Sequence, residues 1–482
     1  MKKSNFILSI LIVGVSSYFL FNSIYFYVPN PDVFEYLTEG KIIINYPFSW
    51  IATPPAYSVL LHILEKILPF ENPGIIGGIL FNILSFTLSM VILWKQSTAW
   101  LGKFAYLVLL VFIVHPLSSL INLQPMNASP ALLLILLVFY LHRRHPILSY
   151  IFIVLAFFCR YEAIVLFPIV LLWDLLEYKR LREPLSFLYS SIPVLIWTMR
   201  GFYEDTVYRP EYTAGYYNKI PNTEFIINAF SSIILNLKTG STPIAIFIIV
   251  WLTIGILICY KKGIIIPLLY GLFIVGYGII HTMFPAVVPR YGYLILPFIL
   301  VLFYWPVVYI NQSNRIGKTI ISCVLIGLTI FITYRSLKYR DFQTNEQWSR
   351  ADKRIAGIWL KNNITKPTIV YAFMNDIIGY FAKNSLVEYP QKYNTYGLSQ
   401  YICDDKKDIL IFIDNEITKK RYYYDYADGQ DFTSVFMNSE IFPYFHHLET
   451  LRIKDYAIKI YRYQAGTKRY GSTLQKLCLD AK

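Results

Sequence analysis

The sequence predicts an α-helical polytopic membrane protein with about 11 transmembrane helices, followed by a small C-terminal α/β domain outside the membrane. Of its 482 residues, 56% are hydrophobic and 15% are charged, whereas soluble domains carry about 25% charged residues. Apolar runs long enough to cross a bilayer recur up to residue 334, and the rest has the mixed composition of a soluble domain. The net charge of +14 reflects basic loops on the cytoplasmic side and requires no nucleic-acid partner.

The apolar runs define the spans in order. The first run, residues 6–28, follows Lys2 and Lys3 and is not followed by a small-residue cleavage site, so we expect a retained signal anchor. The remaining candidates are 74–94, 104–121, 130–141, 147–159, 161–176, 185–200, 243–260, 264–284, 292–310 and 319–334.

Basic clusters occur at every second connection between these spans, and they predict the orientation. The clusters are Lys95 with Lys103, Arg143 with Arg144, Lys179 with Arg180 and Arg182, Lys261 with Lys262, and Arg315 with Lys318. Cytoplasmic loops carry an excess of Lys and Arg, so the N-terminus is expected in the cytoplasm. The sequence therefore predicts a protein of the cytoplasmic membrane, with a membrane module over 1–334 and an extracytoplasmic domain over 335–482.

Residues 147–177 lie between two basic clusters, so an even number of crossings must separate them. We expect a hairpin of two short helices that turns near Arg160, Tyr161 and Glu162. An ionisable group within an apolar run indicates a functional site. Snorkelling or pairing with Glu162 are the structural alternatives for Arg160, and a spacing of two residues disfavours such a pair within a helix.

The first extracytoplasmic loop, residues 29–73, is too polar to cross a bilayer and contains the first acidic residues of the chain. Asp32 and Glu35 have the spacing of a helix start with a capping box, and a carboxylate there is also well placed to act as a base. Tyr36 fits the aromatic belt of a membrane interface. Pro54 and Pro55 are expected to lead into a surface helix over 56–68.

Arg290 is an unexpected cation at the outer mouth of the span 292–310, because the outer side should carry few arginines. Two arginines that face one outer cavity would bind a phosphate in bidentate fashion, and Arg160 is the partner we expect. His281, near the same mouth, is a further candidate for the pocket, with a structural role as the alternative.

The C-terminal tail alternates helical and strand patterns. A helix is expected over 345–362, and strands over 367–373, 409–414 and 456–463. The tail contains no phosphate loop, dinucleotide fingerprint or zinc spacing, which leaves open an acceptor-positioning role or a role as lid or support. Cys403 and Cys478 are able to pair if the tail is extracytoplasmic.

Several motifs occur in a characteristic order: Asp32 and Tyr36 after the first span, the PP-x-Y segment at Pro54–Tyr57, CRYEAIVLFP at 159–168, and RYGYLILP at 290–297. In this order and sidedness the chain resembles the GT-C superfamily of membrane glycosyltransferases, especially protein mannosyltransferases and lipid A aminoarabinose transferases. The resemblance covers residues 6–340.

The resemblance implies an inverting transfer of a sugar from a polyprenyl-phosphate donor to a lipid, glycan or protein acceptor on the outer face. It implies that Asp32, with Glu35 beside it, is the catalytic base, and that Arg160, Arg290 and Tyr291 bind the donor phosphate. Four residues are then expected in the acceptor and donor pocket: Tyr36, Tyr57, Glu162 and His281.

Two other functions stay open at this point. A transporter or flippase of lipid-linked glycans would have internal repeats and acids near the midplane, and the sequence has neither. A non-catalytic protein of the same fold is suggested by Val33 and Thr53, where relatives carry an acid and a Lys. No metal site is predicted, although Asp32 and Glu35 leave a divalent cation open.

Overall fold

The computed structural model describes Gly14, Met437 and residues 32–45, 53–70, 72–208, 250–251, 253–257, 265–282, 289–311, 351–372, 375–389, 395–404, 406–414, 442–453 and 456–465. By their contacts the residues form two units, one of 1–26 with 36–341 and one of 27–35 with 342–482. The predicted spans 6–28 and 319–334, and most of 243–260, lie outside the described residues.

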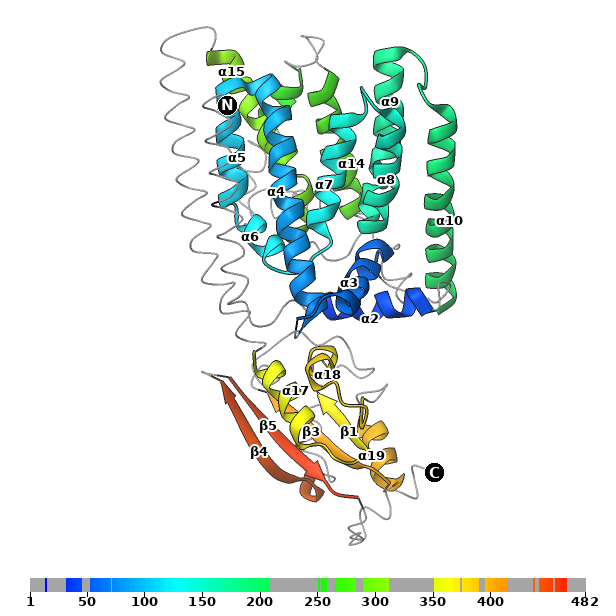
Figure 1. The fold of residues 1–482 in the computed structure, drawn as a ribbon, viewed down its shortest axis with the longest axis vertical. Helices are drawn as coiled ribbons and strands as arrows, with labels where there is room; N and C mark the ends of the chain where they lie inside the picture. Colours follow the sequence, from blue (N-terminus) through cyan, green and yellow to red (C-terminus); the bar gives the residue numbers. More distant parts are fainter. Residues whose placement is uncertain are drawn as a thin grey trace. The chain divides into compact units, whose positions relative to one another are not determined.

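The first unit is helical (Figure 1). Its elements are α2 (Asp32–Asn45, shared with the second unit), α3 (Pro55–Ile67), α4 (Pro73–Leu101), η1 (Gly102–Phe104), α5 (Ala105–Val114), α6 (Pro116–Asn122), α7 (Ala128–Leu141), α8 (Pro146–Cys159), η2 (Tyr161–Val165), α9 (Leu166–Tyr178), α10 (Pro184–Tyr208), α14 (Ile265–Thr282), η3 (Pro289–Leu294) and α15 (Leu296–Asn311).

Proline begins several of these helices. Pro55, Pro73 and Pro146 occupy the first turns of α3, α4 and α8. At this position a backbone N–H has no acceptor within the helix, so proline, which lacks the N–H, costs no hydrogen bond. Pro116 has a second effect, because the residue before a proline disfavours the helical region. His115 is accordingly extended, with ψ 136°. The candidate span 104–121 is therefore not one continuous helix: it consists of α5 and the short α6.

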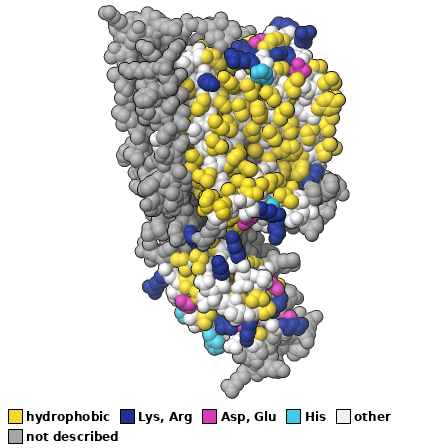
Figure 2. All heavy atoms as spheres, in the orientation of Figure 1, with side chains coloured by type: hydrophobic (Ala, Val, Ile, Leu, Met, Phe, Trp, Pro, Cys, Tyr) yellow, Lys and Arg dark blue, Asp and Glu magenta, His cyan; other side chains and the backbone are white. Residues whose placement is uncertain are grey.

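The outer surface of the helical unit is apolar. Figure 2 shows a broad field of hydrophobic side chains, with charged side chains gathered toward the ends of the helices. On α4, the exposed residues Leu80, Leu84 and Leu88 follow each other at intervals of four and so share one helix face. Contiguous exposed apolar surface of this extent indicates a membrane or another partner, and lipid is the partner that the composition predicts.

The helices differ in length. Within the described residues, α4 is the one helix that is long and apolar enough to cross a membrane by itself, with 29 residues, or about 43 Å. Shorter apolar helices are Ala128–Leu141, Pro146–Cys159, Ile265–Ile280 and Leu296–Pro306. The expected helical architecture is observed, and the number of crossings stays a prediction.

The predicted hairpin between the basic clusters is observed. Helix α8 ends at Cys159, η2 follows the turn, and α9 ends at Tyr178. Arg160 stands between the helices with extended backbone, at φ −151° and ψ 117°. The hairpin thus places Arg160 and Glu162 together at its turn.

The second unit is a five-stranded sheet of order β2-β1-β3-β5-β4 with helices on both faces. Its elements are α17 (Ala351–Asn363), β1 (Thr368–Ala372), α18 (Asn375–Ala382), β2 (Val387–Glu388), α19 (Thr395–Asp404), β3 (Asp408–Asp414), η4 (Phe442–Tyr444), β4 (His446–Ile453) and β5 (Tyr456–Tyr463). Strand β1 is parallel to β2 and β3, and β5 is antiparallel to β3 and β4.

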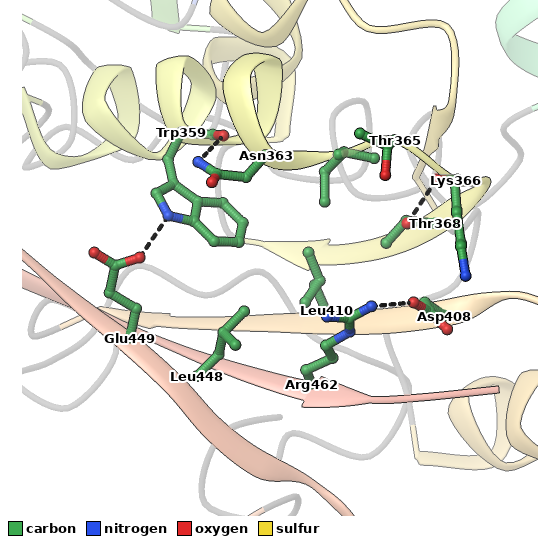
Figure 3. A pocket seen from close by; sticks show the side chains of 11 residues that line it. Trp359, Asn363, Thr365, Lys366, Thr368, Asp408, Leu410, Leu448, Glu449 and Arg462 are labelled. Atoms are coloured by element: carbon green, nitrogen blue, oxygen red, sulfur yellow. Dashed lines mark hydrogen bonds and ion pairs between the residues drawn. The ribbon is translucent and has the colours of Figure 1, made fainter. Parts of the chain in front are cut away.

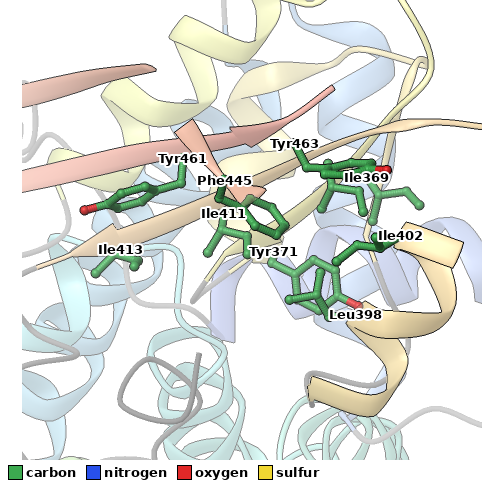
Figure 4. Close-up of a cluster of buried hydrophobic side chains, with 10 residues drawn as sticks. Ile369, Tyr371, Leu398, Ile402, Ile411, Ile413, Phe445, Tyr461 and Tyr463 are labelled. Atoms are coloured by element: carbon green, nitrogen blue, oxygen red, sulfur yellow. The ribbon is translucent and has the colours of Figure 1, made fainter. Parts of the chain in front are cut away.

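Alternation along the strands divides the core of this unit into two layers. Ile369 and Tyr371 point to the face that α19 covers with Leu398 and Ile402 (Figure 4). The intervening Val370 and the other residues of its face pack against α17 and α18. Each predicted strand is observed, and α18, α19, β2 and β4 are elements that the sequence patterns did not predict.

Candidate functional site

The turn of the α8–α9 hairpin holds a buried ion pair. The Arg160 guanidinium donates from Nη2 to Glu162 Oε1 at 2.6 Å and from Nε to Glu162 Oε2 at 3.1 Å. Both side chains are almost enclosed, with 9% and 11% exposed. A bidentate contact of this kind fixes the orientation of both planar groups.

The structural alternative for Arg160, a pair with Glu162, is observed. A spacing of two residues disfavours such a pair within a helix, whereas Arg160 has extended backbone and Glu162 lies in the 3₁₀ turn η2. The break in the helix brings the two side chains to the same side. A charged pair is expensive to bury, and it stabilises a protein less than its distance suggests, so its place inside an apolar unit favours a functional role.

A third residue joins the pair from another part of the unit. Arg160 Nη1 donates to Asn127 Oδ1 at 3.2 Å, and Asn127 directly precedes α7. The connection between α6 and α7, residues 123–127, thus contacts the hairpin turn. Asn127 was not among the predicted site residues; the signal in the sequence is an amide between apolar runs on the predicted outer side.

Tyr36 and Tyr57 are both buried and lie edge to face, with ring centroids 5.5 Å apart. The Tyr57 hydroxyl donates to Asn82 Oδ1 at 3.0 Å. Burial raises the pKa of Tyr57 well above its ordinary value, so the phenol keeps its proton and acts as a donor. That the two tyrosines line the acceptor and donor pocket stays a prediction.

Asn82 connects α4 to the segment that carries Asn127. Its Nδ2 donates to the carbonyls of Ile121, Gln124 and Met126, at 3.3, 2.7 and 2.9 Å. A buried amide that satisfies carbonyls of an irregular segment holds that segment in one conformation. Asn82 lies within an apolar run, and sequence reasoning did not select it.

The end of the first loop contacts the same hairpin. Thr53 donates from its backbone N to Glu39 Oε2 at 3.1 Å, and its hydroxyl donates to the same oxygen. The Tyr161 hydroxyl donates to the Thr53 carbonyl at 3.1 Å, and Trp197 Nε1 donates to the Tyr161 oxygen at 3.0 Å. Thr53, which occupies the place of the relatives' Lys, therefore ties α2 to the hairpin turn.

The other predicted site residues are distributed as follows. Asp32 is the first residue of α2 and is half-buried, and Glu35 is exposed one turn later. Both belong by their contacts to the second unit, so their joint action with Arg160 stays a prediction. The side chains of Arg290, Tyr291 and His281 lie outside the described residues.

A second buried polar cluster lies at the end of the α8–α9 hairpin that is opposite to the turn at Arg160. His142 Nδ1 lies 2.8 Å from Ser149 Oγ, and His142 Nε2 lies 2.9 Å from Asp174 Oδ1. All three residues have zero exposure, which leaves no access for a substrate. Arg182 donates its backbone N–H to the same aspartate. This Ser–His–Asp set therefore stabilises the ends of α7, α8 and α9.

Metal ligands are not gathered in the part of the chain that the structure describes: no group of three or more His, Cys, Asp or Glu side chains is placed to hold an ion. The divalent cation that the sequence left open stays untested. The polar set at the hairpin consists of Arg160, Glu162, Asn127 and Asn82, which bond to one another, to Tyr57 and to backbone carbonyls.

No protein-family model matches the sequence, and no curated protein matches it either. Among solved structures, the chain is similar to ArnT from Cupriavidus metallidurans in two crystal structures, one bound to undecaprenyl phosphate and one in the apo state. The TM-score is 0.57 for both, with 11% and 10% identity, and each match covers 95% of this chain and 98% of the other. The chain therefore has the fold of ArnT, and the predicted resemblance to the GT-C membrane glycosyltransferases is confirmed at the level of the fold.

Proposed function

We propose that this protein is an integral-membrane glycosyltransferase that takes a sugar from a polyprenyl-phosphate donor and transfers it to an acceptor on the extracytoplasmic face. The observation that carries the proposal is the likeness to ArnT over 95% of the chain, because one of those structures is bound to undecaprenyl phosphate. The acceptor class, whether lipid, glycan or protein, is left to experiment.

The proposed chemistry is an inverting displacement. Asp32 removes the proton from the acceptor hydroxyl, the hydroxyl oxygen attacks the anomeric carbon, and the bond from that carbon to the lipid phosphate breaks. A positioned base contributes about 10²–10⁴-fold to such a step. Glu35 lies in the same first turn of α2 and is the second carboxylate of the proposed catalytic pair.

The leaving phosphate develops negative charge, and preorganised cations stabilise it. Arg160 is the proposed ligand, together with Arg290 and Tyr291. Arg160 is held in place by Glu162 and Asn127, so its guanidinium is oriented before the donor binds. Tyr36, Tyr57 and His281 complete the proposed sugar pocket.

The orientation follows from the basic loops, with the N-terminus in the cytoplasm and the domain from residue 335 outside, in a protein of about 11 crossings. A second observation supports the outward domain: Cys403 is disulfide-bonded, to a partner outside the described residues. Disulfides persist in oxidising compartments and are rare in the cytosol.

The test uses purified full-length protein in lipid with radiolabelled polyprenyl-phosphate sugars. We expect the wild type to consume donor and Asp32→Asn to lose about 10²–10⁴-fold in rate, while its yield and thermal stability are kept because Asp32 is half-buried at a helix start. Lys41→Gln, at an exposed position on the same helix outside the proposed site, is the control and should keep the activity.

A fully active Asp32→Asn variant would exclude Asp32 as the base. Consumption that stops in the presence of a chelator would add a metal ion to the mechanism. If no donor is consumed, and labelled lipid instead crosses the bilayer of a liposome, the protein is a flippase with this fold.

A further inference from the structure

A pocket of about 330 Å³ opens on the second unit, between the end of α17 and the sheet (Figure 3). Its floor consists of Thr368 at the start of β1 and Leu410 on β3, both buried. Its volume falls within the range of about 300–1,000 Å³ that is usual for small-ligand sites. No sequence motif marks this pocket, because its residues come from α17, from the loop that follows it and from four different strands.

One wall of the pocket is the indole of Trp359. The ring packs against Phe412 with centroids 6.1 Å apart, and its Nε1 donates to Glu449 Oε2 at 2.6 Å. These two contacts hold the indole ring between α17 and β4, and the ring lines the pocket there. An oriented aromatic face is suited to the C–H-rich face of a flat or ring-shaped ligand.

The charges around the pocket cancel. Lys366 and Arg462 are balanced by Asp408 and Glu449. Arg462 Nη2 donates to Asp408 Oδ2 at 2.6 Å, and the backbone N–H of Ala465 donates to the other oxygen at 2.9 Å. Because these four charges sum to zero, the pocket has no net attraction for a phosphate or a carboxylate, which favours a neutral ligand.

The rim formed by the end of α17 and the loop after it offers hydrogen-bonding groups. Asn363 uses its Nδ2 for the Trp359 carbonyl, at 2.9 Å. Its Oδ1, the Thr365 hydroxyl and the Lys366 ammonium make no hydrogen bond within the described residues, and all three side chains are exposed at the pocket. Donors and acceptors thus stand beside an aromatic wall, which is the arrangement that a polyhydroxylated ring requires.

We propose that this pocket is a binding subsite for a neutral saccharide. One pyranose ring stacks on Trp359, and its hydroxyls bond to Asn363, Thr365 and Lys366. The inference goes beyond the proposed function, because such binding requires no sugar transfer and holds for a transferase, a flippase or a binding protein.

The test is saturation-transfer NMR on the full-length protein in lipid nanodiscs, with cellobiose, chitobiose and maltose as probes and inorganic phosphate as competitor. We expect at least one disaccharide to receive saturation at its ring C–H protons. Trp359→Ala should weaken that binding about ten-fold, and Trp359→Phe should retain most of it. Lys361→Ala, an exposed position on α17 outside the pocket, is the control.

Lys366→Ala and Asn363→Ala change only the exposed rim, so they keep the test valid if Trp359→Ala fails to fold. Loss of binding in these variants supports the subsite. The proposal is overturned if none of the three disaccharides binds at millimolar concentration, if phosphate displaces the sugar, or if the rim and Trp359 variants bind like the wild type. The same experiment with Asp32→Asn should show unchanged binding, which separates this inference from the transfer activity.

Discussion

Two arginine–carboxylate pairs have the same length and different surroundings. The Arg160–Glu162 pair of the helical unit and the Arg462–Asp408 pair of the sheet unit both have an N–O distance of 2.6 Å. The side chains of the first pair are 9% and 11% exposed, and those of the second are 38% and 11% exposed. The guanidinium of Arg462 therefore keeps part of its water, and that of Arg160 does not.

The comparison teaches that distance alone says little about what an ion pair does. Removal of one partner from a buried pair costs about 3–5 kcal/mol, because the remaining charge is stranded. Exposed pairs contribute about 0–1 kcal/mol. Replacement of a buried pair by an apolar pair of the same volume costs little, so stability alone explains the Arg160–Glu162 pair poorly.

The largest effect is expected from Arg160→Met, which removes the bidentate partner of the buried Glu162 carboxylate. The free energy of unfolding should fall by about 3–5 kcal/mol, measured by titration with SDS in mixed micelles, and donor consumption should be lost. The double variant Arg160→Met with Glu162→Leu should recover most of the stability and none of the activity. A double variant that recovers activity would show that the pair is only structural.

An intermediate effect is expected from Asn82→Leu. The variant leaves the Tyr57 hydroxyl and the carbonyls near Asn127 without their amide partner, and an unsatisfied buried polar group costs about 1–3 kcal/mol. The same SDS titration measures it. Leu84→Ala, on the exposed face of the same helix, is the control and should change the stability less. Equal losses in both variants would contradict a special role for the amide.

The smallest effect is expected from Arg462→Gln, which removes the half-exposed cation while Asp408 keeps the Ala465 N–H. The free energy of unfolding should change by no more than about 1 kcal/mol. Arg143→Gln is the matched control, since its pair with Glu177 spans 3.0 Å with 48% and 21% exposure. A loss as large as that of Arg160→Met would show that burial does not separate the two pairs.

By itself, the sequence determined the membrane class, the short-helix hairpin and the strands of the C-terminal domain. These features follow from local patterns: apolar runs, basic clusters at alternate connections, and alternating side chains. The hairpin was found because charge at both flanks excludes a single crossing, and this argument needs no knowledge of packing.

The tertiary structure alone decided how the site is assembled. Arg160 and Glu162 pair because the helix breaks between Cys159 and Tyr161. Helix propensities summed over the apolar run do not show where that break lies. Asn82 and Asn127 join the site through contacts between α4, the segment before α7 and the hairpin.

The pocket beside Trp359 shows the same limit in the second unit. Trp359 and Glu449 lie 90 positions apart in the chain, and neither belongs to a recognisable motif. Their contact depends on the register of β4 and on the way α17 crosses the sheet. Long-range pairing of this kind is a property of packing, and the residue types alone do not encode which partners meet.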